Sequence, residues 1–446
     1  MKRVPRKLKF VKHIHDPIHG FIGLTEVELK IVDSPLFQRL RRISQLGPVS
    51  YVYPTATHNR FSHSLGTMHM STRILDKLLY DPYSDIDIDR DEEEYYKQLL
   101  RIAALLHDIG HPPFSHALEI EDNIFGVPPV KHKKLGLLII EKSDILQKCL
   151  EESDIKIEKQ NILDILERKH KKQELNLIIS SPFDADKMDY LSRDSYFTGI
   201  PYGAPDINRL LMILSIIEAD GAKTWAVPKK GLTAIKEMIL GRYHMFESVY
   251  YHKTVSGFEA LLQMIYCELL YLNIVEHPEE LIKNKNWKEW FTYDDTYILS
   301  ILRGIDKDKI RAEEPIKDSL REKVSMYINR VPPVKVEEGK RYNLKETYSR
   351  EYTYILLLQE NMKNDPNREW MLIYRPFLVM LSEASEKMES LYVMRKNEEP
   401  VPFREIDSPL IETIRNTCYT LLRLYTKKDL EPFFKEKLEE IKRKMM

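Results

Sequence analysis

The adjacent residues His107 and Asp108 are the pair in this sequence most suited to chemistry. An imidazole beside a carboxylate is a mixed nitrogen and oxygen ligand pair for a divalent metal. The apolar run LLRIAALL before them predicts a helix that stops there, because Gly110, Pro112 and Pro113 follow. The carbonyls at such a helix end also favour a cation. One His-Asp pair is more often an ordinary core or surface feature, so other segments must support a site.

Two further segments supply candidate metal ligands. THNRFSHSLGTMHM contains His63 at the start of a predicted helix, and SSPFDADKMDYLSRDSYFTGIPYG contains Asp186 within a dense group of carboxylates. Together with the first pair they suggest a metal bound by His63, His107, Asp108 and Asp186. Such a set leaves positions on an octahedral ion that water and a phosphate oxygen can fill.

Chemistry on phosphate also needs cations for the other phosphate oxygens and a proton donor for the leaving oxygen. The candidate cations are Arg60, Lys187 and Arg242. Imidazoles titrate near neutral pH and can supply the proton. The candidate imidazoles are His111, His116 and His132.

Composition excludes several classes of protein. The chain has 446 residues, of which 43% are hydrophobic and 31% charged, as expected for a globular protein with a large core. The formal net charge of −1 gives no bulk attraction to nucleic acid or to a membrane surface. No apolar run is long enough to span a bilayer, and three scattered cysteines suit a reducing compartment. We therefore expect a cytoplasmic protein.

Helical periodicity dominates the sequence and predicts a mostly α fold. We expect a helical catalytic domain over residues 1–325, with the metal site within 58–195, and a smaller mixed α+β lobe over residues 326–446. Paired prolines and charges near 331–343 mark the boundary. Strand-like runs in the lobe are YTYILLLQ, REWMLIYRPFLVML and SLYVMRKN, and AKTWAVPKKGLTAI predicts a hairpin that turns at Lys-Lys-Gly.

The ordered motifs resemble one known family. NRFSHS, HDIGHPPFSH and DADKMDYLSRD, preceded by IHDPIHGFIGL and IVDSPLFQRLRRISQLG, are similar to the HD-domain phosphohydrolases, and most of all to the deoxynucleoside triphosphate triphosphohydrolases. The resemblance implies an all-helical core that assembles as a dimer or tetramer. It also implies attack of water on the α-phosphorus, which yields a deoxynucleoside and inorganic triphosphate.

The resemblance implies a role for each matching position. The metal ligands match His63, His107, Asp108 and Asp186. The catalytic histidines match His111, His116 and His132, with His116 placed to protonate the leaving group. The triphosphate is held at Arg60, Lys187 and Arg242. Positions near the sugar and base match Gln45, Leu46, Tyr190, Asp194 and Tyr250. A regulatory nucleotide site between subunits matches Asp33, Gln38, Arg39 and Arg41.

The implied cofactor is one divalent ion, for which Mg²⁺, Mn²⁺, Fe²⁺, Ni²⁺ and Zn²⁺ are all compatible, with room for a second Mg²⁺ on the substrate phosphates. Two positions depart from the family pattern. Lys133 follows His132 where many relatives have Glu, so the carboxylate that would orient this imidazole is either missing or supplied by another residue. Phe246 stands where eukaryotic relatives place a histidine beside the sugar, which leaves discrimination against ribonucleotides open.

Two alternatives remain at the level of sequence. The same metal site could act on another nucleotide, a phosphomonoester or a cyclic phosphodiester. The chain could also be a nucleotide-sensing module without catalysis, although a complete set of costly buried ligands argues against this.

Overall fold

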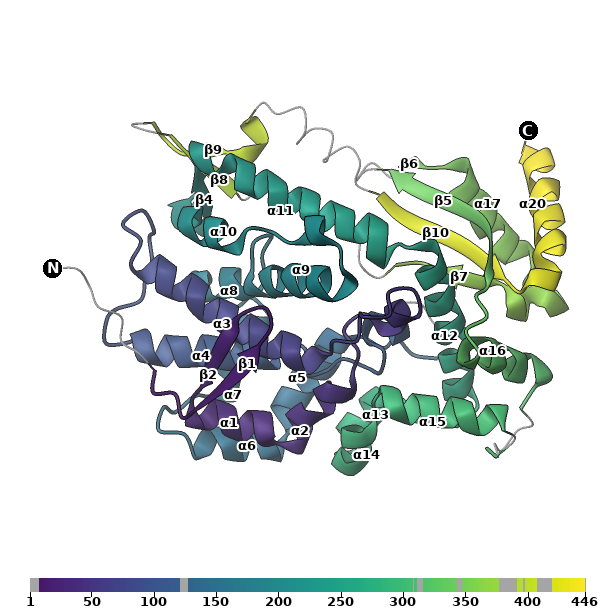
Figure 1. Cartoon of the computed structure of the whole chain (residues 1–446), viewed down its shortest axis with the longest axis horizontal. Helices are drawn as coiled ribbons and strands as arrows, with labels where there is room; N and C mark the ends of the chain where they lie inside the picture. Colours follow the sequence, from purple (N-terminus) through teal and green to yellow (C-terminus); the bar gives the residue numbers. More distant parts are fainter. Residues whose placement is uncertain are drawn as a thin grey trace.

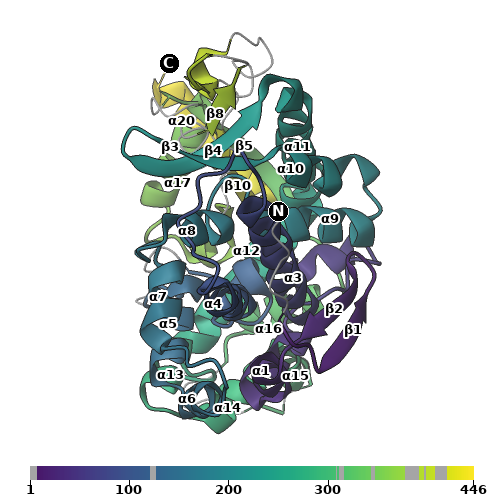
Figure 2. The same ribbon diagram turned by 90° about the vertical axis from the view of Figure 1, so that its left-hand side faces the viewer.

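Helices form most of the molecule, and two small sheets lie along one side of them (Figure 1). The structure is a computed structural model that describes residues 8–120, 127–307, 309–310, 316–342, 347–376, 391–395, 398–406 and 419–445. The view turned by 90° shows β3 and β4 above the helices, with the hairpin of β1 and β2 at their side (Figure 2). The mostly α prediction is confirmed.

Three helices at the centre carry the residues of interest. They are α3 (Arg60–Leu79), α4 (Glu93–Leu106) and α9 (Ala185–Thr198), and α3 packs against both others. Asn59 caps α3 and Asp184 caps α9, each accepting a backbone N–H of the first turn. The helix α4 is buried along nearly its whole length and ends at Leu106, as the glycine and prolines after it predict.

The remaining helices surround this centre. Those before the second half of the chain are α1 (Glu26–Asp33), α2 (Pro35–Gln38), α5 (His132–Lys142), α6 (Asp144–Glu151), α7 (Lys159–Leu166), α8 (Gln173–Ile179) and α10 (Ile207–Ile213). Those after it are α11 (Leu232–Met245), α12 (Lys253–Tyr271), α13 (Pro278–Lys283), α14 (Trp287–Thr292), α15 (Asp295–Asp306), α16 (Asp318–Ile328), α17 (Arg350–Asn361) and α20 (Glu431–Met445). A π-helical turn at Phe246–Tyr250 follows α11 directly.

The strands form one hairpin and two four-stranded sheets. The hairpin pairs β1 (Lys12–Asp16) with β2 (Gly20–Leu24). One sheet has the order β6-β5-β10-β7, made of β5 (Val334–Tyr342), β6 (Thr347–Tyr348), β7 (Leu372–Tyr374) and β10 (Tyr419–Thr426). The other has the order β3-β4-β8-β9, made of β3 (Ser215–Ala219), β4 (Ala222–Pro228), β8 (Leu391–Met394) and β9 (Val401–Pro402).

The second sheet joins distant parts of the chain. β8 pairs in parallel with β4, with Trp225 opposite Leu391 in the register. A strand of the expected C-terminal lobe therefore completes a sheet begun in the expected catalytic domain. The division at 325/326 stays a prediction.

Two local expectations were wrong. The hairpin of β3 and β4 turns at Asp220 and Gly221, which adopt positive φ values of 52° and 76°, while Lys229–Gly231 form a short 3-10 helix. The run YTYILLLQ lies in helix α17, because Ser349 caps it and its buried residues recur with helical spacing. The other two runs contain strands as predicted: REWMLIYRPFLVML contains β7, and SLYVMRKN contains β8. The part of REWMLIYRPFLVML beyond Pro376 lies outside the described residues.

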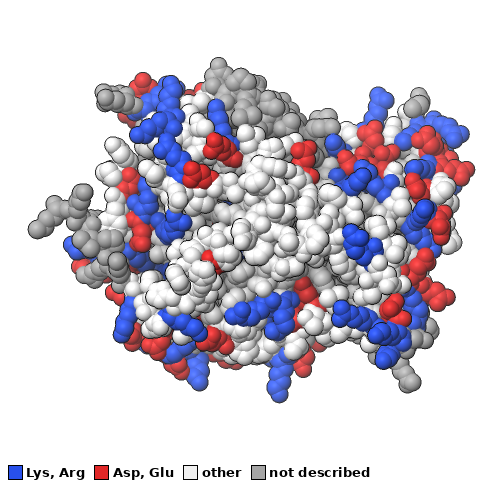
Figure 3. Space-filling view, viewed as in Figure 1, with Lys and Arg blue, Asp and Glu red and all other residues white. Residues whose placement is uncertain are grey.

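The charged side chains on the visible face of the molecule are of both signs and interspersed along its rim, and no large patch of one sign covers its centre (Figure 3). Within the described part of the chain, no helix has both the length and the apolar composition that crossing a membrane requires.

Candidate active site

Three helix ends bring the four predicted metal ligands together. His63 lies in the first turn of α3, His107 follows the last residue of α4, and Asp186 lies in the first turn of α9. The Nε2 atoms of His63 and His107 are 3.1 Å and 3.6 Å from Asp186 Oδ1. Asp108 completes the group, since its two oxygens are 3.4 Å from His63 Nε2 and 3.3 Å from His107 Nε2. We call these four residues the metal-binding cluster.

The donor atoms of this cluster fit a divalent metal. His107 donates its Nδ1–H to the Ala104 carbonyl at 2.7 Å, and His63 Nδ1 is 2.8 Å from Asp189 Oδ2. These bonds direct both Nε2 lone pairs at the carboxylates, where the two atoms are buried without a hydrogen-bond partner among the described residues. Two bare imidazole nitrogens facing two carboxylates have the chemistry of a metal site.

The electrostatics of the cluster agree with this arrangement. Burial opposes the charge on Asp186, but the nearby His107 and His63 imidazoles hold the pKa of its carboxyl well below the usual range. Burial also opposes the charge on Asp108, where the Arg60 guanidinium keeps the pKa low. The cluster therefore keeps both carboxylates ionised and ready to bind a cation.

Asp189 supports the cluster and was not predicted. It is fully buried, meets His63 and His19, and binds Arg193 through both oxygens. Its carboxylate thereby fixes the orientation of the His63 ring. The sequence held a signal for it, because Asp189 lies three residues after Asp186 on the same helix, within one turn.

The three predicted phosphate-binding cations line one cavity together with His107, Asp108 and Asp186 of the cluster. Arg60 Nη1 is 2.6 Å from Asp108 Oδ2, and Lys187 Nζ is 2.8 Å from Asp184 Oδ2. Arg242 is buried, and its Nε has no hydrogen-bond partner among the described residues. A buried guanidinium nitrogen without a partner is costly unless a ligand oxygen accepts from it.

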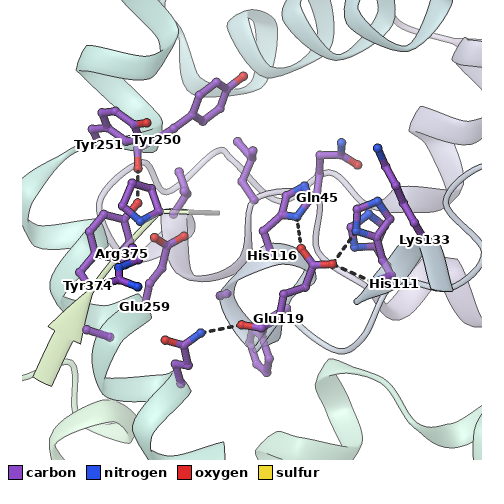
Figure 4. A pocket seen from close by; sticks show the side chains of 18 of the residues that line it. Gln45, His111, His116, Glu119, Lys133, Tyr250, Tyr251, Glu259, Tyr374 and Arg375 are labelled. Atoms are coloured by element: carbon purple, nitrogen blue, oxygen red, sulfur yellow. Dashed lines mark hydrogen bonds and ion pairs between the residues drawn. The ribbon is translucent and has the colours of Figure 1, made fainter. Parts of the chain in front are cut away.

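The three predicted catalytic histidines pack together beside the cluster. The rings of His111 and His132 stack at 4.1 Å and 8° to each other, and His116 stands edge-on to both. Behind them lies Glu119, whose carboxylate accepts from Nδ1 of His116 at 2.6 Å and of His132 at 2.5 Å (Figure 4). We call these three imidazoles the histidine trio.

Glu119 supplies the carboxylate that Lys133 does not provide for His132. The carboxylate that orients His132 comes from Glu119, three residues after His116, rather than from the residue after His132. Burial opposes the charge on Glu119, but the two imidazoles hold the pKa of its carboxyl well below its usual range. An ionised Glu119 accepts from Nδ1 of both rings and so fixes their tautomer and orientation.

Two hydrogen bonds from other parts of the chain fix the loop that carries His111 and His116. The His111 carbonyl accepts from Arg39 Nη2 at 2.8 Å, and Asp295 accepts from the Phe114 N–H at 2.6 Å. Phe114 has a left-handed backbone with φ 57°. These bonds fix a loop conformation that bulky residues adopt at a cost.

Arg39 is one of the four positions that the family resemblance matches to a regulatory nucleotide site. It is fully buried, with its guanidinium 3.9 Å from the Trp290 ring and bonded to two carbonyls. Asp33 and Arg41 are exposed and Gln38 is half-buried. Arg39 thus supports the loop that carries the histidine trio, and the regulatory match of all four residues stays a prediction.

The residues matched to the sugar and base line the same cavity: Gln45, Leu46, Tyr190, Asp194 and Tyr250. Tyr250 donates its hydroxyl to Asp194 Oδ2 at 2.6 Å, and His58 Nε2 is 2.7 Å from the other oxygen. Phe246 is fully buried against the Tyr250 ring, so it presents no polar group in place of a histidine.

The cavity has a volume of about 1090 Å³ and reaches well beyond the metal-binding cluster. The histidine trio lies at one end, and Tyr250, Tyr251, Glu259, Tyr374 and Arg375 lie at the other (Figure 4). The expected C-terminal lobe thus contributes to the wall of the site, which the sequence did not indicate.

Comparison with known proteins agrees with this geometry. Residues 60–214 match the family model described as HD domain. An uncharacterised protein of Methanocaldococcus jannaschii is 37% identical over 296 residues, which span 66% of this chain and 55% of that protein. The deoxynucleoside triphosphate triphosphohydrolase SAMHD1 of Homo sapiens is 31% identical over 278 residues, or 56% of this chain and 44% of that enzyme. The chain therefore spans about half the length of these relatives.

Solved structures agree over nearly the whole chain. A phosphohydrolase from Bacteroides thetaiotaomicron has a TM-score of 0.70 at 25% identity, covering 93% of this chain and all of that one. A protein from Aquifex aeolicus has a TM-score of 0.67 at 24% identity and shows the same fold.

Proposed function

Because this chain belongs to the HD-domain phosphohydrolase superfamily and is similar to its dNTP triphosphohydrolases, we propose that it hydrolyses deoxynucleoside triphosphates to a deoxynucleoside and inorganic triphosphate. One observation supports this most. The bare imidazole nitrogens of His63 and His107 meet two carboxylates beside a cavity that also contains Arg60, Lys187 and Arg242. Three cations beside one cation site suit a substrate with several phosphates.

The metal-binding cluster would hold the divalent ion. When bound, that ion supplies Lewis-acid charge next to the α-phosphate. Mg²⁺, Mn²⁺, Fe²⁺, Ni²⁺ and Zn²⁺ all accept this donor set, and a second Mg²⁺ could accompany the substrate phosphates.

The other side chains divide the remaining work. Arg60, Lys187 and Arg242 bind phosphate oxygens and offset their charge. His116 gives a proton to the leaving oxygen of the sugar, because it lines the cavity and Glu119 orients its ring through Nδ1. Gln45, Leu46, Tyr190, Asp194 and Tyr250 surround the sugar and the base.

The assembly state and regulation belong to the same proposal. The family resemblance implies a homo-oligomer, as a dimer or tetramer, and an activating nucleotide near Asp33, Gln38, Arg39 and Arg41. We also propose that the protein acts in the cytoplasm.

Product analysis tests the reaction. The pure protein, incubated with each dNTP and Mn²⁺ or Mg²⁺, should release inorganic triphosphate and deoxynucleoside in equal amounts, read by phosphorus NMR and chromatography. A second, non-hydrolysed nucleotide should be added in a parallel series to detect activation. Release of orthophosphate or pyrophosphate would sink the proposal, as would turnover of only phosphomonoesters or cyclic phosphodiesters. Binding of nucleotide without turnover would favour a sensing module.

A further inference from the structure

The cavity also contains, on the side of Tyr250 and Tyr374, a carboxyl group that the proposed reaction does not use. Glu259 lies on α12 and lines the cavity, and Figure 4 shows it beside Tyr374 and Arg375. No Lys, Arg or His of the described residues lies within ion-pair distance of it. A half-buried carboxyl that faces a ligand cavity without an ion pair invites a hydrogen-bonding ligand.

Two series of contacts along the cavity connect the residues of the proposed site with Glu259. Along one wall, Tyr250 binds Asp194 through its hydroxyl, and the Tyr250 carbonyl lies 3.3 Å from the Tyr374 hydroxyl. That hydroxyl also meets the Glu259 carboxyl. Glu259 is therefore the next polar group beyond the residues that would surround the sugar.

The other wall begins at the histidine trio. The Glu119 carbonyl accepts from Gln263 Nε2 at 2.6 Å. Gln263 lies one turn after Glu259 on α12, and both line the cavity. A nucleotide with its phosphates between the metal-binding cluster and the trio would thus direct its base toward Glu259.

Burial disfavours the ionised form of this carboxyl. It raises the pKa of Glu259 to about 8, although the Tyr374 hydroxyl and the more distant charge of Arg423 act in the opposite direction. Two hydrogen-bond donors brought by a ligand would add to that opposing effect and favour the ionised form.

We propose that Glu259 reads the base of the substrate and favours guanine. This inference rests on the proposed function. An ionised carboxylate only accepts hydrogen bonds, and guanine alone offers two adjacent N–H donors, from N1 and N2, to its two oxygens. Adenine and cytosine offer one amino donor next to a ring nitrogen whose lone pair faces the carboxylate. Thymine offers one N–H between two carbonyl oxygens.

The size of the preference follows from these contacts. A bidentate pair between a side chain and a base discriminates by about tenfold to a hundredfold against a base that cannot form it. Glu259→Gln replaces one acceptor by an amide donor at nearly constant volume, so it should remove most of the preference for guanine. The loss should be seen mainly in KM for dGTP.

The experiment compares kcat/KM for triphosphate release from the four dNTPs with the wild type, Glu259→Gln and the control Glu94→Gln. Glu94 is exposed in the first turn of α4, outside the cavity. The wild type and the control should prefer dGTP by about tenfold or more over dATP, dCTP and dTTP, and Glu259→Gln should reduce this ratio to about threefold or less with dATP turnover retained.

Three outcomes would overturn the inference. The first is a wild type that turns over all four dNTPs equally. This result overturns the inference by itself, even if Glu259→Gln fails to fold. An unchanged ratio in Glu259→Gln does so as well, and so does an equal loss for all four substrates in a folded variant. Failure of the proposed function looks different, because then no dNTP yields triphosphate.

Discussion

The two ends of the cavity are built differently. At the end proposed to bind phosphates, called the phosphate end, carboxylates lie in contact with imidazoles and with the Arg60 guanidinium. At the base end, Glu259 stands in the described residues without an ion pair, and its pKa is raised to about 8. The carboxylates of the metal-binding cluster therefore stay ionised at neutral pH, whereas Glu259 at the base end changes charge near physiological pH.

The elements that carry the two ends also differ. The phosphate end is made by the ends of α3, α4 and α9, which pack in the helical core. The base end is made by α12 together with β7, a strand of the expected C-terminal lobe. We infer that the first end fixes the reaction and the second end selects the molecule on which it is performed.

The largest effect is expected from Asp108→Asn at the phosphate end. The change keeps the volume of the side chain but removes one carboxylate from the metal-binding cluster. Turnover of every dNTP should fall by about a thousandfold or more, because the ion supplies several kcal/mol of stabilisation to the transition state. Elemental analysis of the purified variant should show the metal lost together with the activity.

The comparison breaks if this variant retains either metal or turnover. It also breaks if turnover falls for one base more than for another, since the phosphate end should act on all substrates alike. Thermal unfolding of the variant checks that the pairing of Arg60 with Asp108 is not needed for folding.

His116→Gln should have the next largest effect. Loss of the proton donor lowers kcat by about a hundredfold to ten-thousandfold, as is usual for general acids. The metal content should stay at the wild-type level, because His116 lies outside the metal-binding cluster. A kcat within a few-fold of the wild type would remove His116 from the proton transfer and leave His111 and His132 as candidates.

Glu119→Gln should have a smaller effect at the same end. Its amide cannot accept from His116 and His132 as the carboxylate does, so one ring loses its orientation and the imidazolium loses a counter-charge. Loss of such a supporting carboxylate costs about tenfold to a hundredfold in activity. The pH profile of kcat should shift toward lower pH, since a protonated His116 is stabilised less. An unchanged profile would show that Glu119 only holds the fold.

The smallest effect is a change of selectivity with pH at the base end. Glu259 has a pKa raised from 4.5 to about 8, so it is protonated below that pH and ionised above it. Arg423 from β10, Tyr374 from β7 and Arg375 are the other ionisable groups on this side. The ratio of kcat/KM for dGTP over dATP should rise by about threefold to tenfold between about pH 7 and about pH 9, because only the ionised form excludes adenine.

The same ratio in Glu259→Gln should be flat over this range, while the absolute rates can change through the histidine trio. A ratio that falls as pH rises would reverse the assignment, since a neutral carboxyl would then be the form that selects. If the ratio still rises with pH in Glu259→Gln, the titrating group that controls base selectivity is Tyr374 or Arg375 instead.

How much the sequence predicted differs between the two ends. His107 and Asp108 stood out because a helix stop follows them at once, and α4 ends at Leu106 as expected. His63 was found because it lies at the start of a predicted helix, and Asp186 because it lies within a dense group of carboxylates. Asp189 and Glu119 were missed although each lies three residues from a predicted site residue.

The sequence by itself determined the local chemistry: which side chains could bind a metal, which could carry protons, and where helices begin and end. These depend on neighbours within one or two helical turns. Only the tertiary structure decided that Arg39 is buried under the catalytic loop, that β8 completes a sheet with β4, and that Glu259 and Tyr374 close the cavity. Contacts between segments far apart in the sequence, such as Arg39 and His111, depend on packing, and no local pattern encodes them.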